Sequence, residues 1–126
     1  MILVDSDVFI DALRGREPSR SKIADGLEEG TLVTTTVTAF ELLSGARSTK
    51  QAERIDALLA PLELLPFDED ASRAAAGARR ELEARGETIG MGDYLIAGIC
   101  LSRALPLLTR NRNRFDRVPG LLLVDH

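Results

Sequence analysis

The sequence contains little cysteine and little histidine. Cys100 is the only cysteine, so the chain forms no internal disulfide and holds no cysteine-rich metal site. Because Cys100 lies in an apolar stretch, we expect it to be a buried free thiol. His126, the last residue, is the only histidine, which argues against a catalytic triad or a histidine metal site. We therefore expect any catalytic chemistry to use other side chains.

Long apolar runs and a positive net charge are lacking as well. No run approaches the roughly 20 apolar residues that span a bilayer, and the N-terminus lacks the features of a signal peptide. We therefore expect a cytoplasmic protein with no membrane partner. The formal net charge of -4 argues against strong non-specific binding to nucleic acid, which depends on cations that neutralise phosphates. A local basic patch is compatible with this charge.

The pattern along the chain predicts one α/β domain over residues 1–126. Short, apolar, branched segments alternate with segments of helical periodicity. The predicted strands are residues 1–4, 31–36, 63–67, 105–109 and 121–124. The predicted helices are residues 7–15, 19–30, 38–46, 50–62, 68–86 and 92–104. This alternation predicts a three-layer α/β/α sandwich around a mainly parallel sheet.

Three acidic residues map to the carboxyl ends of the predicted strands, where open parallel sheets bind their ligands. Asp5 directly follows the first strand. Glu41 lies in the first turn of the helix that follows the second strand, and Asp93 begins the helix 92–104. We expect these three carboxylates to point into the same crevice.

Each acid also has an ordinary structural explanation. Thr38 and Glu41 have the T-x-x-E spacing of a capping box, and Asp93 stands where an N-cap is expected. Caps do not explain why all three acids converge, and gathered carboxylates repel one another unless a cation joins them. Lys22 and Lys50 lie elsewhere in the pattern. A hard divalent cation such as Mg²⁺ or Mn²⁺ suits a site with only oxygen ligands.

The first segment carries two further acids, Asp7 and Asp11. We expect Asp7 to cap the first helix and Asp11 to face solvent. Asp5 is harder to explain structurally, because a carboxylate that follows four buried-type residues is costly unless it is paired or bound to a metal.

The segment TRNRNRFDR (109–117) follows the fourth predicted strand. Asn111 stands just past the strand and Asp116 five residues later. The segment also holds a basic cluster of Arg110, Arg112, Arg114 and Arg117. Taken alone, this cluster fits a solvated loop as well as a phosphate clamp, and its position beside an acidic crevice favours the clamp.

Taken together, these motifs resemble the PIN-domain ribonucleases, and most closely the VapC-like toxins of bacterial toxin-antitoxin modules. MILVDSDVFIDALRG resembles the opening strand and helix of the family, and TTTVTAFELLSGAR resembles its E-L-x-x-G helix. GETIGMGDYLIAGIC is similar to its D-x-L-I-A helix, and LLTRNRNRFDRVPGLLLVDH to its closing T-R-N strand and tail. The four motifs occur in the family's order across essentially the whole chain.

The resemblance implies a metal-dependent ribonuclease that hydrolyses RNA phosphodiester bonds as the toxin of a toxin-antitoxin module. It makes Asp5, Glu41 and Asp93 the catalytic acids that bind Mg²⁺ or Mn²⁺. The cation would polarise the phosphate and activate a water molecule for attack. The resemblance also implies three partners: an RNA substrate, a cognate antitoxin and a second copy of the chain in a homodimer.

The chain departs from the family pattern at the fourth acid, whose position is occupied by Asn111. Either Asp116 substitutes for this acid or the site holds one strong metal. Ser6 and Thr109 match hydroxyl positions that support the metal ligands, and Asp7 stands where the family often has asparagine or serine. The predicted contacts with RNA or antitoxin are Arg110, Arg112 and Arg114.

Other functional classes fit parts of the sequence. ILVDSDVF also matches the opening of haloacid-dehalogenase-type phosphatases, with Asp5 as nucleophile and Asp7 as acid. That chemistry needs a lysine near the phosphate and a second late acidic pair, but no lysine follows Lys50 and no second aspartate lies near Asp93. A receiver domain fits no better, because it needs a phosphorylatable aspartate after its third strand and a late lysine, and this chain has no lysine after Lys50. A PIN-like binding module without catalysis stays open because of Asn111.

Overall fold

A parallel five-stranded sheet forms the centre of the protein. The structure is a computed structural model that describes residues 1–126. The strands are β1 (Ile2–Val4), β2 (Leu32–Thr35), β3 (Leu64–Leu65), β4 (Leu107–Leu108) and β5 (Leu123–Val124). Their order is β3-β2-β1-β4-β5, and every neighbouring pair is parallel. All five predicted strands are confirmed, each shorter than predicted.

Seven helices surround the sheet. They are α1 (Ser6–Leu13), α2 (Ser19–Glu29), α3 (Thr36–Ser44), α4 (Thr49–Leu59), α5 (Glu69–Arg85), α6 (Met91–Arg103) and α7 (Arg112–Phe115). Six of them were predicted. The single turn of α7 was missed, because the arginine-rich segment offered a solvated loop as its simplest interpretation; the side chain of Phe115 is fully buried there. None of the helices is both long and apolar enough to cross a membrane.

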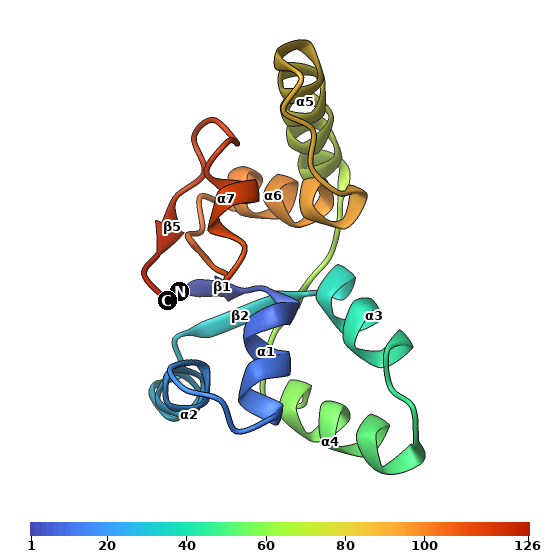
Figure 1. The fold of residues 1–126 in the computed structure, drawn as a ribbon, viewed down its shortest axis with the longest axis vertical. Coiled ribbons are helices and arrows are strands. Elements are labelled where there is room, and N and C mark those ends of the chain that lie inside the picture. Colours follow the sequence, from blue (N-terminus) through green and yellow to red (C-terminus); the bar gives the residue numbers. More distant parts are fainter.

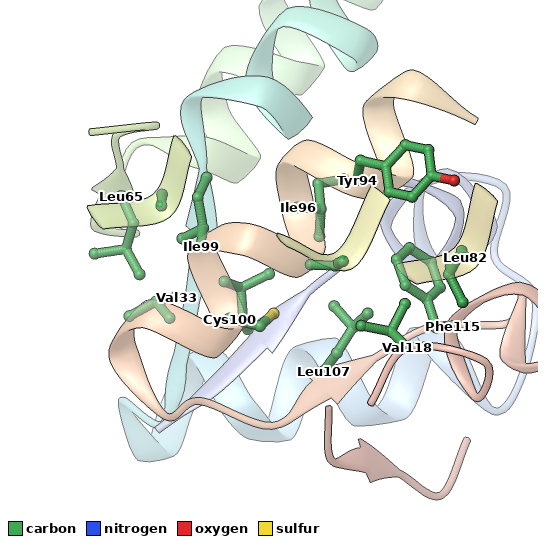
Figure 2. Close-up of a cluster of buried hydrophobic side chains, with 14 residues drawn as sticks. Val33, Leu65, Leu82, Tyr94, Ile96, Ile99, Cys100, Leu107, Phe115 and Val118 are labelled. Atoms are coloured by element: carbon green, nitrogen blue, oxygen red, sulfur yellow. The ribbon is translucent and has the colours of Figure 1, made fainter. Parts of the chain in front are cut away.

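Each central strand sends consecutive side chains to opposite faces of the sheet, as strand geometry requires. The chain therefore has two apolar cores, one on each face. Leu3, Val33 and Leu107 pack in the core under α5, α6 and α7, which Figure 2 shows in close-up. Val4, Leu32 and Leu108 pack in the other core, under α1 to α4. The two helical layers lie on either side of the strands (Figure 1), so the predicted α/β/α sandwich is confirmed.

The predicted burial of Cys100 is confirmed. Its side chain is 1% exposed and packs in the core under α5 and α6. Burial raises the pKa of this thiol to about 12, so it stays protonated and unreactive near neutral pH.

The order of the strands creates a switch point between β1 and β4. From β1, the strands β2 and β3 follow one another on one side, and β4 and β5 follow one another on the other side. Val4 is in register with Leu108, and the amide of Asp5 donates a hydrogen bond of 3.0 Å to the carbonyl of Leu108. Parallel α/β sheets bind ligands at such a point, beyond the carboxyl ends of the strands.

The close contact between α5 and α6 yields a prediction about stability. A Cβ at Gly98 would lie 2.5 Å from the carbonyl oxygen of Ala71 and 2.7 Å from the Cβ of Ala75. The backbone of Ala71 in α5 cannot move aside as a flexible side chain could. We therefore expect Gly98→Ala to lower the free energy of unfolding by about 1–3 kcal/mol in urea denaturation.

Gly77 in α5 is the matched control, since a Cβ there would meet nothing within 4 Å. Gly77→Ala is expected to raise the free energy of unfolding by roughly 0.5–1 kcal/mol, because alanine restricts the unfolded chain and favours the helix. Equal effects of the two substitutions would contradict the assignment of Gly98 to a tight helix contact.

Candidate active site

Asp5 lies at the junction of β1 and α1 and is 3% exposed. One carboxylate oxygen accepts the backbone N–H of Ser6 at 2.8 Å, and the other accepts the hydroxyl of Thr109 at 2.8 Å. Asp5 is thus the N-cap of α1. Burial and, secondly, the charge of Asp7 raise the pKa of Asp5 to about 7, while its two hydrogen bonds act in the opposite direction.

Asp7 lies in the first turn of α1, so the prediction that it caps this helix was wrong. Asp5 is the N-cap instead, because it directly precedes the helix and has the extended backbone that is typical of N-cap residues. Asp7 Oδ2 accepts the backbone N–H of Arg110 at 3.0 Å, and the Thr109 hydroxyl is 3.5 Å from the same oxygen. Asp7 Oδ1 is buried without a hydrogen-bond partner. Burial raises the pKa of Asp7 as well.

Glu41 extends from the second turn of α3, one turn later than predicted. The helix begins earlier because Thr35 is its N-cap, and the Thr35 hydroxyl accepts the backbone N–H of Thr38 at 2.9 Å. The predicted capping box between Thr38 and Glu41 is therefore wrong. This leaves the exposed Glu41 carboxylate without a role in starting its helix.

Glu41 lies close to the start of α6, where Asp93 is found. A Cβ at Gly92 would be 3.1 Å from Glu41 Oε2. Partial burial raises the pKa of Glu41, followed by the charges of Asp93 and Asp7. Glu41 therefore lies within electrostatic reach of Asp7 on α1 and of Asp93 on α6.

Asp93 is the third residue of α6, and Gly90 is the N-cap. The ordinary explanation of Asp93 as the N-cap does not hold, but its carboxylate reaches back to accept the Gly90 N–H at 3.1 Å. Its side chain is 15% exposed, and Arg114 lies 3.5 Å from it. Asp93 therefore accepts a capping hydrogen bond within its own helix and also pairs with the exposed Arg114.

We call Asp5, Asp7, Glu41 and Asp93 the acidic cluster. As these side chains lie, no three of the acids, histidines and cysteines form a group close enough to hold one metal ion. The chemistry of the donor set nevertheless fits a hard divalent cation, because every donor is oxygen and the pKa values of Asp5, Asp7 and Glu41 are raised. The unpartnered Asp7 Oδ1 is a further sign that the cluster lacks positive charge.

The other predicted site residues differ in position. The Ser6 side chain interacts with Glu41 and opposes the rise in its pKa. Asn111 follows Thr109 closely, and its backbone N–H donates to the Thr109 hydroxyl at 3.0 Å. Asp116 is exposed at the end of α7 and makes no hydrogen bond or ion pair with the cluster. The structure thus brings Ser6, Thr109 and Asn111 to the cluster, but not Asp116.

Three of the four arginines in the 109–117 segment, Arg110, Arg112 and Arg114, point to different partners. The Arg110 guanidinium donates to Asp11 at 3.0 Å, and that of Arg112 donates to the carbonyl of Val124 at 2.9 Å. Of these three guanidinium groups, only that of Arg114 pairs with an acid of the cluster, Asp93, whereas Arg110 contacts the cluster through its backbone N–H.

The prediction that Asp11 faces solvent was wrong, since its side chain is buried and only 6% exposed. Asp11 lies four residues after Asp7 and therefore on the same face of α1. That spacing was the one signal in the sequence that pointed to the buried face.

Comparison with known proteins identifies the family. The family model for the PIN domain matches residues 2–121. The chain belongs to the PIN-domain family. Within this family, Ribonuclease VapC10 from Mycobacterium tuberculosis is 37% identical over 111 residues, which cover 88% of this chain and 83% of the relative. The predicted resemblance to PIN-domain and VapC-like proteins is confirmed.

Solved structures of PIN-domain relatives have the same fold. The DNA-bound VapBC from Salmonella typhimurium is similar with a TM-score of 0.82 and 27% identity, over 99% of this chain and 98% of that one. VapBC-5 from Mycobacterium tuberculosis, a member of the VapBC family of toxin-antitoxin systems, is similar with a TM-score of 0.69 and 28% identity over 98% of each chain.

The raised pKa of Asp5 predicts how stability depends on pH. Its carboxyl titrates at 3.8 when unfolded and at about 7 in the folded, metal-free protein, so the folded state binds the proton more tightly. Stability from this group is present below about pH 4 and is lost as the pH rises to about 7. We expect urea denaturation in EDTA to show a loss of roughly a few kcal/mol over this range.

Asp5→Asn removes the titrating group and keeps an oxygen for Thr109. The variant should be more stable than the wild type at pH 7, with a flatter pH dependence; Asp7 and Glu41, whose pKa values are also raised, account for the remaining slope. A parallel pH dependence in the two proteins would contradict the raised pKa of Asp5.

Proposed function

We propose that this PIN-domain protein is a metal-dependent endoribonuclease that hydrolyses RNA phosphodiester bonds as the toxin of a toxin-antitoxin module. The observation that supports the proposal is that Glu41 lies within electrostatic reach of both Asp5, at the switch point of the sheet, and Asp93. The relative VapC10 is named a ribonuclease, which supports the reaction class. We propose that the protein acts in the cytoplasm.

In this proposal Asp5, Glu41 and Asp93 hold a Mg²⁺ or Mn²⁺ ion. When bound, such an ion polarises the phosphate and lowers the pKa of a water molecule. The Thr109 hydroxyl and the Ser6 amide hold both oxygens of Asp5 and so fix the direction of its free lone pairs. Asp7 adds a fourth negative charge beside Asp5, which offsets the neutral amide at Asn111.

The proposed partners follow from the VapBC relatives. We propose that a cognate antitoxin binds the protein, as expected for a member of a toxin-antitoxin system of the kind that includes VapBC-5. Arg114 is the segment's arginine best placed to meet an RNA phosphate near the cluster, because it is 57% exposed and lies beside Asp93. The homodimer implied by the resemblance stays a prediction.

A phosphatase with Asp5 as nucleophile is less compatible with the structure. The Asp5 side chain is 3% exposed, and each of its oxygens accepts a hydrogen bond. A nucleophilic carboxylate needs an oxygen that is open to the incoming phosphorus atom. The absence of any lysine after Lys50 also leaves that chemistry without its phosphate-binding cation.

Substitution of the acids tests the proposed reaction. Purified protein should cleave single-stranded RNA with Mg²⁺ or Mn²⁺, and EDTA should stop cleavage. Asp5→Ala and Asp93→Ala should each lower the rate by more than about a hundredfold, because loss of a ligand exceeds the 10- to 100-fold cost of losing a residue behind it. The rates are measured by gel electrophoresis of a labelled RNA.

Asp25→Ala is the control, since Asp25 is an exposed acid on α2. It should cleave at the wild-type rate. Cleavage that persists in both Asp5→Ala and Asp93→Ala would refute the metal site, and metal-dependent release of phosphate from small phosphomonoesters without RNA cleavage would favour the phosphatase.

Arg114 provides a separate prediction about metal affinity. Its guanidinium competes with a cation for Asp93, but the pair is partly exposed and worth less than about 1 kcal/mol. Arg114→Ala should therefore bind Mn²⁺ up to about fivefold more tightly in calorimetry and raise the KM for RNA. Weaker Mn²⁺ binding in this variant would contradict the competition.

A further inference from the structure

The buried carboxylate of Asp11 has no role in the proposed function as described so far. A buried carboxylate is costly unless a cation and hydrogen bonds compensate its charge. Two arginines lie beside it: Arg110 Nη1 is 3.0 Å from Asp11 Oδ1, and Arg16 Nη1 is 3.7 Å from the same oxygen. Only Arg110 is within hydrogen-bond distance, so it is the principal partner.

Arg110 is fastened to α1 at two points. Its guanidinium donates to Asp11, and its backbone N–H donates to Asp7 Oδ2 at 3.0 Å. The two acceptors are four residues apart and so lie one above the other on the helix. The chain that leaves β4 is therefore held along α1 by one residue that binds with both its main chain and its side chain.

The two neighbours of Arg110 in the chain, Thr109 and Asn111, connect it to Asp5. Thr109 precedes it and donates its hydroxyl to Asp5 at 2.8 Å. Asn111 follows it and donates its backbone N–H to the same Thr109 oxygen at 3.0 Å. Because a hydroxyl has one proton, and Asn111 already occupies its acceptor side, the Thr109 proton is directed to the carboxylate.

We propose that Asp11 is a positioning residue for the active site, which acts through Arg110 to hold Thr109 and Asn111 against Asp5. This inference rests on the proposed function, because the group positioned is one of the proposed metal ligands. It also gives Arg110 a different role from the predicted contact with RNA or antitoxin. Its charge is directed to the buried face of α1 and is matched there.

A double-mutant cycle on the full chain tests the coupling. The variants are Asp11→Asn, Arg110→Met and the double substitution, assayed for RNA cleavage with saturating Mg²⁺ at a temperature where all are folded by circular dichroism. Each single variant should lower kcat about tenfold and change KM less than twofold, because small displacements of catalytic groups cost 10- to 100-fold in rate. The double variant should be no slower than the slower single variant.

Two further variants separate positioning from a general loss of charge. Arg110→Lys keeps a cation near Asp11 and should recover a large part of kcat. Arg16→Met removes the other, mostly exposed arginine and should leave kcat within twofold of the wild type. A rise in KM without loss of kcat in Arg110→Met would instead make Arg110 an RNA contact and overturn the proposal, as would additive effects in the cycle.

Amide hydrogen exchange gives a readout that does not need activity. In Asp11→Asn, the amides of Arg110 and Asn111, which donate to Asp7 and Thr109, should exchange at least about tenfold faster, whereas those in α4 should not change. Unchanged exchange at both amides would overturn the proposal. If the wild type fails to cleave RNA while exchange accelerates as expected, the proposed ribonuclease function fails and the positioning contact stands.

Discussion

The hydrogen bond between the Thr109 hydroxyl and the Asp5 carboxylate joins the ends of β4 and β1, two strands that are adjacent in the sheet but distant along the chain. It is the contact on which the arrangement of the acidic cluster depends. Asp5 is fixed by it on one side and by the start of α1 on the other. The hydrogen bond from the Arg110 N–H to Asp7 adds a second contact between the end of β4 and α1. The positions of Asp5 and Asp7 therefore depend on the pairing of β1 with β4.

The acidic cluster is a site of electrostatic conflict within an otherwise consistent fold. The two apolar cores cover the sheet on both faces, whereas burial raises the pKa values of Asp5, Asp7 and Glu41 and leaves one oxygen of Asp7 without a partner. Conflicts of this kind between stability and function are characteristic of active sites, because a site that binds a cation needs uncompensated negative charge. Arg114 compensates the negative charge only at Asp93, through an ion pair with a partly exposed guanidinium.

The fold was predictable because its three central strands, β1, β2 and β4, are largely buried on both faces and therefore appear as short, continuous apolar runs. The positions of Asp5 and Asp93 followed from the same pattern, since both stand next to an element boundary. What sequence could not supply was the direction of individual side chains: Asp11 needs Arg110 from a segment 99 residues away to be buried. The turn of α7 depends likewise on the burial of Phe115, a tertiary effect that local composition does not encode.

The strand order also has a consequence in time. Because β4 pairs with β1 at the switch point, Thr109 reaches Asp5 only after 104 further residues have been added to the chain. Synthesis proceeds from the N-terminus, so Asp5 emerges early and remains without the Thr109 hydroxyl until β4 has been made. A nascent chain that ends before β4 lacks this contact, and the hydrogen bond between Thr109 and Asp5 is therefore among the last to form in the making of the protein.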